Sequence, residues 1–196
     1  TEVTVGENPT VADLRKDYGA VYIAIGAQTD RKIGIEGEDA EGVISAVELL
    51  RGIGDGNMPD FTGKDIVVIG GGNVAMDVAR SSIRLGAKRL RIAYRRRAVD
   101  MTAMAEEVSG AVEEGCELLD LHAPLRIEKD GEGKVAALWV KPQIIGPVKN
   151  GRPVPLDSAQ EEVRLACDMV IVAVGQGIES KAFEKNGIPV KRGVIE

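Results

Sequence analysis

The chain has 196 residues, and 44% of them are hydrophobic, which is enough for the core of one domain or of one domain with pieces of a second. Its formal net charge of −6 argues against nucleic acid as a partner. No apolar run is long enough to cross a membrane, no secretory signal is visible, and Cys116 and Cys167 fit neither a metal site nor a dithiol centre, so we expect a cytoplasmic protein without metal ligands.

The first 63 residues predict only short elements. Residues 1–26 indicate three pieces that are too short for a domain: a strand at Val3 to Val5, a helix starting near Thr10 and an apolar strand from Ala20 to Ile25. Residues 27–63 mix charged residues and glycines around one predicted helix, Val43 to Arg51. We interpret them as a connecting segment.

From Lys64 onward, strands alternate with amphipathic helices, and we expect one domain over residues 64–175. The predicted elements are a strand over Ile66 to Gly70, a helix over Asn73 to Leu85, a strand over Leu90 to Tyr94, a helix over Ala103 to Glu114 and a strand over Glu117 to Leu121. We expect these strands to lie side by side in one parallel sheet.

Antiparallel hairpins follow between about residues 125 and 166. The dipeptides Asp130-Gly131 and Asn150-Gly151 are typical of turns between strands, and they predict an inserted β-meander. The apolar run Met169 to Val174 predicts a strand that rejoins the parallel sheet, and residues 176–196 leave the domain again. The expected fold is α/β, with helices on both faces of the parallel sheet.

Gly70, Gly72 and Ala75 form a G-x-G-x-x-A motif that follows a strand and opens a helix. In a Rossmann-like βαβ unit this motif binds the pyrophosphate of a dinucleotide, because the glycines permit a tight turn and close approach of the backbone. Asn73 is the expected N-cap, and the amides after it would face the anion at the positive end of the helix dipole. The simpler alternative is a turn that needs glycines only for its shape.

The end of the second strand indicates which dinucleotide binds. NAD-binding sites place an acidic residue there, about 20 residues after the glycines, to bind the ribose 2′-hydroxyl. Here the stretch reads Tyr94-Arg95-Arg96-Arg97, and guanidinium groups bind a 2′-phosphate instead. We therefore expect NADP(H), with Arg95 and Arg96 as the main phosphate ligands and Arg97 as a third candidate.

The alternative for this stretch is a solvated or nucleic-acid-binding basic patch over Lys88 to Arg97. That interpretation explains neither the upstream glycine motif nor the position of the arginines at the end of a strand, where ligands of open α/β sheets bind. It stays open as the competing hypothesis for the arginines.

Acid–base catalysis has no candidate residues in this sequence. No tyrosine is followed by a lysine four residues later, as in short-chain dehydrogenases, and the single histidine, His122, has no nucleophile as a partner. The Glu106-Glu107 and Glu113-Glu114 pairs are typical of a solvated helix face. We expect no catalytic residue, because hydride exchange between two cofactors requires the protein mainly to position them.

Five sequence segments together resemble the glutamate synthase small (beta) subunit family. They are VVIGGGNVAMD at 67–77, GA at 86–87, YRR at 94–96, MTA at 101–103 and IVAVGQ at 171–176. Related proteins are the amino-terminal half of dihydropyrimidine dehydrogenase and the large subunit of NADH-dependent ferredoxin–NADP oxidoreductases. The resemblance implies that Gly70, Gly72, Asn73, Val74 and Ala75 hold the pyrophosphate, that Arg95 and Arg96 hold the 2′-phosphate, and that Gly175 and Gln176 lie near the nicotinamide. The full set of expected cofactor-binding residues also includes Gly71 and Arg97.

The resemblance also implies an NADPH domain inserted into an FAD domain. Residues 1–26 and 176–196 would then be parts of the FAD domain, while the FAD fingerprint and the iron–sulfur cysteines of the family would lie outside this chain. We expect this chain to bind NADPH without FAD, and its parent protein to pass electrons to iron–sulfur centres and to an acceptor such as a glutamate synthase large subunit or a ferredoxin. The absence of C-x-x-C excludes the dithiol relay of thioredoxin reductases.

A second hypothesis is a non-catalytic module that senses NADP(H) or regulates a partner. The sequence of the parent protein would discriminate the two, because an FAD fingerprint upstream supports the enzyme and its absence supports the sensor.

Overall fold

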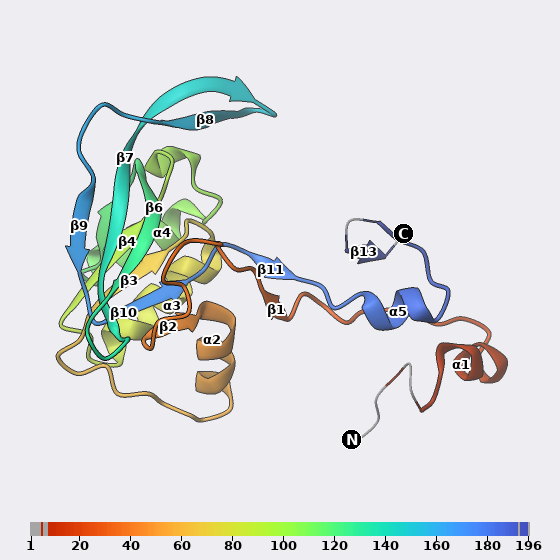
Figure 1. The fold of residues 1–196 in the computed structure, drawn as a ribbon. Coiled ribbons are helices and arrows are strands. Elements are labelled where there is room, and N and C mark those ends of the chain that lie inside the picture. Colours follow the sequence, from red (N-terminus) through yellow and green to blue (C-terminus); the bar gives the residue numbers. More distant parts are fainter. Residues whose placement is uncertain (1–4, 6–7, 192, 196) are drawn as a thin grey trace. The chain divides into compact units, whose positions relative to one another are not determined.

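The computed structural model describes residue 5, residues 8–191 and residues 193–195. The chain divides into a larger unit, residues 30–175, and a smaller unit, residues 1–29 with 176–196 (Figure 1). Apart from Val5, which lies in a turn, the strand predicted at Val3 to Val5 falls outside the described residues. None of the helices in these described ranges is both long enough and apolar enough to cross a membrane.

Five parallel strands form the central sheet of the larger unit, in the order β2-β10-β3-β4-β5. Their bounds are β2 (Val43–Ser45), β3 (Asp65–Ile69), β4 (Arg89–Ala93), β5 (Glu117–Leu119) and β10 (Met169–Val172). The central strand β3 is a continuous apolar run because both of its faces are covered. The predicted return of the chain to the parallel sheet is confirmed, since β10 inserts between β2 and β3.

Three helices cover one face of this sheet: α2 (Ala46–Gly54), α3 (Asn73–Arg84) and α4 (Ala105–Glu113). Alternate sheet residues such as Ile66, Val68 and Ile92 point toward them and are buried. On α3 the buried side chains include Ala75 and Ala79, whose small size lets the helix lie close to the sheet.

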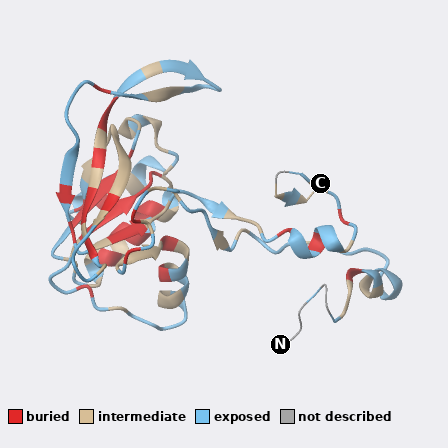
Figure 2. Cartoon of the chain, in the orientation of Figure 1, coloured by how far each residue is buried: buried red, intermediate tan, exposed pale blue. Residues whose placement is uncertain are grey.

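Antiparallel strands cover the other face, where we expected further helices. They are β6 (His122–Lys129), β7 (Val135–Lys149), β8 (Arg152–Asp157) and β9 (Val163–Ala166). Apolar residues of β6, β7 and β9 share a buried cluster with the sheet residues that point away from α3. Figure 2 shows buried segments on the central sheet and on β7. Leu138 and Val140 of β7, for example, share a buried cluster with Val67 of β3. The meander is therefore a structural layer of the domain.

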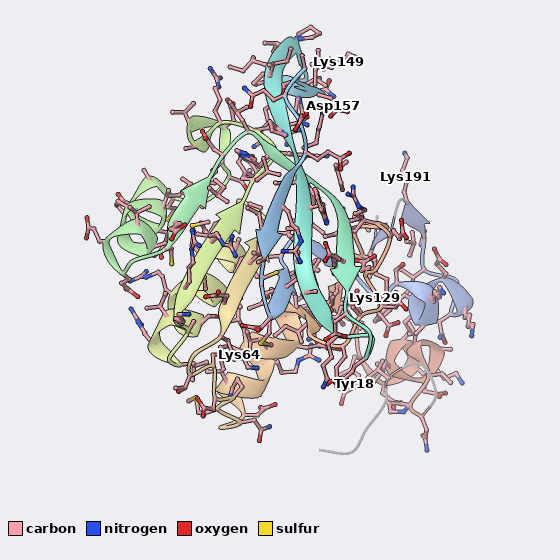
Figure 3. The ribbon with its side chains drawn as sticks, turned by 60° about the vertical axis from the view of Figure 1, so that its left-hand side comes forward. Tyr18, Lys64, Lys129, Lys149, Asp157 and Lys191 are labelled. Atoms are coloured by element: carbon pink, nitrogen blue, oxygen red, sulfur yellow. The ribbon has the colours of Figure 1, made fainter. Side chains whose placement is uncertain are left out.

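The second half of β7 continues beyond the packed sheet and pairs with β8 as a two-stranded ribbon. The turn predicted at Asn150-Gly151 connects the two strands, and both residues have the positive φ angles that such turns require. Figure 3 shows Lys149 and Asp157 on this ribbon, at the opposite end of the unit from Lys64 and Lys129. The ribbon contributes a contact to the site described below.

Residues 27–63, expected as a connecting segment, supply both β2 and α2 to the larger unit. The predicted helix Val43 to Arg51 thus begins later than expected, because its first residues form the edge strand β2. Ser45 separates the two elements: its Oγ accepts a hydrogen bond from the Glu48 amide at 3.1 Å and caps α2.

The smaller unit contains α1 (Val11–Asp17), α5 (Lys181–Lys185), β12 (Val190–Lys191) and β13 (Val194–Ile195). Thr10 and Asp13 form a capping box that starts α1 at the predicted position. The strand predicted over Ala20 to Ile25 is wrong, because these residues pair with no strand in the described chain, and Tyr22 is 92% exposed. The strands β1 (Thr29–Asp30) and β11 (Gln176–Gly177) pair where the chain passes between the units.

Candidate functional site

The glycine motif forms the turn between β3 and α3, and two of its glycines are required by packing. Gly70 has a φ of 153°, and a Cβ there would lie 2.4 Å from the Ala173 carbonyl oxygen. A Cβ on Gly71 would lie 2.5 Å from the ring of Tyr94. Any side chain at either position would therefore collide with its neighbours.

Gly72 differs from these two glycines, because the fold does not require it. Its φ of −104° and ψ of 175° suit any residue. Beyond its chain neighbours, a Cβ there would have one described atom within 4 Å, Thr102 Oγ1 at 3.4 Å. The absent side chain leaves open space at the start of α3.

Donor groups border this open space. The backbone amides of Gly72, Asn73 and Val74 donate to no acceptor within residues 8–191 and 193–195. They lie at the amino end of α3, where unpaired amides and the helix dipole favour an anion. Val74 is half-buried here, and Ala75 is fully buried against the sheet, as its expected role in close packing requires.

The prediction that Asn73 caps α3 is wrong. Gly72, with extended backbone, is the N-cap, and Asn73 is the first helical residue, so its side chain lies one position too late to cap its own helix. Asn73 Oδ1 instead accepts a hydrogen bond from the Met104 amide at 2.9 Å, just before α4. Asn73 thus connects the starts of α3 and α4.

The three arginines after β4 have different surroundings. Arg95 is exposed and has no partner in the part of the chain that the structure describes. Arg96 Nε donates to the Pro153 carbonyl oxygen of the β7–β8 ribbon at 3.2 Å. Arg97 forms a bidentate pair with Asp100 at 2.7 and 2.8 Å. The sequence placed Arg97 after Arg95 and Arg96 as a phosphate ligand, and the structure gives each of the three side chains different contacts.

The pair between Arg97 and Asp100 neutralises the charge of Arg97. Hydrogen bonding to Asp100 raises the pKa of Arg97, and the same contact lowers the pKa of the Asp100 carboxyl. Asp100 was not among the residues predicted at the site, although an acid three residues after an arginine is a recognisable pairing signal. Of the three arginines, Arg97 is the one whose charge is already satisfied within the chain.

A short segment connects the three arginines after β4 to the glycine turn. It runs through the 3₁₀ helix η1 (Ala98–Asp100) to Met104. The Tyr94 hydroxyl donates to the Asp100 carbonyl at 3.0 Å, while the amides of Thr102 and Ala103 donate to the Gly71 carbonyl at 3.0 and 3.1 Å. The structure therefore brings the predicted pyrophosphate and 2′-phosphate residues into one connected region.

The last two predicted site residues follow β10. Gly175 has a φ of 124°, which favours glycine, and its carbonyl accepts a hydrogen bond from the Arg31 amide at 3.3 Å. Gln176 is exposed and begins β11, in the smaller unit.

The cysteines, the histidine and two of the glutamates are buried or bonded within the fold. Both cysteines are buried, and burial raises the pKa of Cys116 and of Cys167 to about 11, which disfavours the thiolate. His122 is half-buried, and its Nδ1 lies 2.6 Å from the Asp120 carbonyl oxygen. The predicted solvated helix face is partly paired, because Glu107 of α4 and Glu114, the residue that caps the end of α4, both bond to Arg80 of α3.

Known proteins are similar in sequence to this chain over most of its length. The family model for pyridine nucleotide-disulphide oxidoreductases matches residues 1–196. The small chain of NADPH glutamate synthase from Escherichia coli K12 is 37% identical over 182 residues, which are 87% of this chain and 39% of that protein. The beta subunit of NADP(+)-dependent formate dehydrogenase from Moorella thermoacetica is 35% identical over 193 residues, which are 97% of this chain and 27% of that protein. The chain thus spans less than half the length of these relatives.

The expected resemblance to the glutamate synthase small subunit is confirmed by these relatives. Among solved structures, Mycobacterium tuberculosis FprA in complex with NADPH has a TM-score of 0.78 at 22% identity, covering 99% of this chain and 59% of that one. This similarity confirms the expected α/β fold class, with its Rossmann-like sheet and antiparallel insertion.

Proposed function

This chain belongs to the pyridine nucleotide-disulphide oxidoreductase family, and we propose that it forms the NADP(H)-binding part of a flavoprotein oxidoreductase. The observation that carries the proposal is the open space at Gly72, bordered by the free amides of Gly72, Asn73 and Val74. A strand–helix turn with a purely structural role would have no need of glycine at this position. A bound pyrophosphate would need it, because its oxygens must approach the backbone closely.

Within this proposal the turn from Gly70 to Ala75 holds the pyrophosphate. Gly70 and Gly71 give the turn its shape, since side chains there would collide with Ala173 and Tyr94. Gly72 provides the space for the anion, and the amides of Asn73 and Val74 donate to it. Ala75 keeps α3 close to the sheet, so the helix start stays next to the strand end.

Arg95 and Arg96 bind the 2′-phosphate in this proposal. Arg95 is exposed and unpaired within the described residues, so its full charge is available to a phosphate. Arg96 is oriented by its Nε contact with Pro153, which leaves the terminal nitrogens of the guanidinium for the ligand. Gly175 and Gln176 are the proposed residues on the nicotinamide side.

Bound NADPH supplies a hydride, and this chain binds and orients the nucleotide. The described residues of the smaller unit do not fit FAD as a second dinucleotide: α1 and α5 start from Thr10 and Ser180, and neither start is a glycine turn. We therefore propose that the flavin that accepts the hydride is held by other parts of the parent protein, which passes electrons on to a partner of the glutamate synthase or ferredoxin type.

Replacing Arg95 with alanine should weaken NADPH binding about ten- to a hundredfold, since a charged hydrogen bond contributes roughly 1.5–3 kcal/mol. Arg96→Ala should act in the same direction. NADH binding should hardly change in either variant, because NADH lacks the 2′-phosphate. Titration calorimetry with both nucleotides measures this, and equal affinities of the wild-type chain for NADPH and NADH would contradict the proposed phosphate site.

Arg97 should contribute little to NADPH binding, because Asp100 already neutralises it. Removing Arg97 alone would leave an unpaired carboxylate, so the informative variant is Arg97→Ala combined with Asp100→Asn. This double variant should bind NADPH within about fivefold of wild type, roughly 1 kcal/mol, since the guanidinium of Arg97 is already bonded to Asp100 and is not needed by the phosphate. A loss as large as that of Arg95→Ala would show instead that Arg97 leaves Asp100 to bind the phosphate.

A further inference from the structure

Thr102 lies beside the glycine turn, in the loop between η1 and α4. Its amide and that of Ala103 donate to the Gly71 carbonyl at 3.0 and 3.1 Å, and the next amide, from Met104, donates to Asn73 at 2.9 Å. Three consecutive backbone amides therefore hold the loop against the turn. A substitution that changes only the Thr102 side chain leaves all three of these contacts in place.

The Thr102 hydroxyl borders the space that Gly72 leaves open. Its Oγ1 lies 3.4 Å from the point that a Gly72 Cβ would occupy. The hydroxyl donates to the Gly71 carbonyl oxygen over a long 3.4 Å, and Thr102 is exposed. A hydrogen bond of this length is weak, so the hydroxyl proton is free to turn toward a stronger acceptor.

We propose that the Thr102 hydroxyl donates a hydrogen bond to a pyrophosphate oxygen of NADP(H). This inference rests on the proposed function. The free amides of Gly72, Asn73 and Val74 approach the same space from the start of α3, whereas Thr102 approaches it from the loop before α4. An anionic oxygen accepts several such bonds at once, and bonds to ionised acceptors are short and strong. Thr102 would therefore complete a ring of donors around the anion.

The test compares Thr102→Val, which removes the hydroxyl at nearly constant shape, with Thr102→Ser, which keeps it. Thr102→Val should weaken NADPH binding about tenfold, the loss of one hydrogen bond to a charged group, and Thr102→Ser should bind within about threefold of wild type. Adenosine 2′-monophosphate, which carries the 2′-phosphate without a pyrophosphate, serves as the second ligand. Its affinity should be the same for all three proteins, and their melting temperatures without ligand should agree.

Three results would overturn the proposal for Thr102: wild-type NADPH affinity in Thr102→Val, equal weakening in Thr102→Ser, or equal weakening for both ligands. The last result would place Thr102 at the 2′-phosphate or give it a structural role. These results, obtained with a wild-type chain that binds NADPH, leave the proposed function intact. A wild-type chain that binds no NADPH overturns the proposed function and this inference together.

Discussion

Replacing Gly72 with valine should abolish measurable NADPH binding while the chain stays folded. The backbone at Gly72 is extended, which suits a β-branched residue, and its missing side chain points into open space. Valine would fill the space that the pyrophosphate needs and would separate it from the amides of Asn73 and Val74. Losing two or more charged hydrogen bonds should weaken binding more than about a hundredfold. Titration calorimetry measures the loss of NADPH binding, and circular dichroism measures whether the variant stays folded.

Gly71→Val is the matched control, because it places the same side chain one residue earlier. A Cβ there would lie 2.5 Å from the Tyr94 ring, so this variant should lower the melting temperature substantially. Gly72→Val should lose only the order of 1 kcal/mol, the cost of a poor N-cap residue. Intact NADPH binding by folded Gly72→Val would mean that the glycine turn is structural, the simpler alternative for this motif.

The glycine turn could be predicted from the sequence because the signals that create it are local. A buried strand, a glycine that must adopt positive φ and a helix with small residues on one face occur within about twenty residues of one another. The structure adds the distinction between Gly71 and Gly72, which look alike in the sequence. That distinction depends on Tyr94 and Thr102, which are distant in the chain and close to the turn in space.

The errors in the predicted fold arise where the structure depends on distant partners. Ala20 to Ile25 has the composition of a strand, but a strand requires a hydrogen-bonded neighbour, and these residues have none in the described part of the chain. The sequence also did not predict that antiparallel strands, and not helices, cover the second face of the parallel sheet. The dipeptides Asp130-Gly131 and Asn150-Gly151 predicted the hairpins correctly, but they could not show that the apolar side of β6, β7 and β9 packs on Val67 and Val170.

The arginine stretch shows the same limit for the site. Its position at the end of β4 could be predicted, because the arginines directly follow the apolar run of that strand in the sequence. Whether each side chain is available to a phosphate could not be predicted. Arg96, for example, contacts Pro153, which lies 57 residues further along the chain in the β7–β8 ribbon. Arg97 pairs locally with Asp100 only because η1 turns the backbone at this point.

The purified chain should bind NADPH but retain no FAD, and it should not reduce dye acceptors with NADPH. The larger unit offers a strand–turn–helix for one dinucleotide, whereas the cluster of buried apolar residues in the described smaller unit comprises Val11, Phe183 and Ile188. A flavin needs its own pyrophosphate turn and an enclosing apolar pocket, because burial must offset the cost of immobilising it. Absorbance spectra of the purified chain, with and without added FAD, measure flavin retention.

NADPH should nevertheless stabilise the chain, because a ligand that binds only the folded state shifts the unfolding equilibrium. At a hundred times its Kd, NADPH contributes about 2.7 kcal/mol, which for a chain of this size raises the melting temperature by about 5–10 °C. Arg95→Ala, measured at the same NADPH concentration, should show a smaller rise, and NADH should affect both proteins equally. A yellow preparation, or NADPH-dependent dye reduction without added flavoprotein, would contradict this expectation. Either result would mean that residues 1–29 and 176–196 hold far more of a flavin site than the few buried side chains described there indicate, and that hydride exchange occurs within this chain.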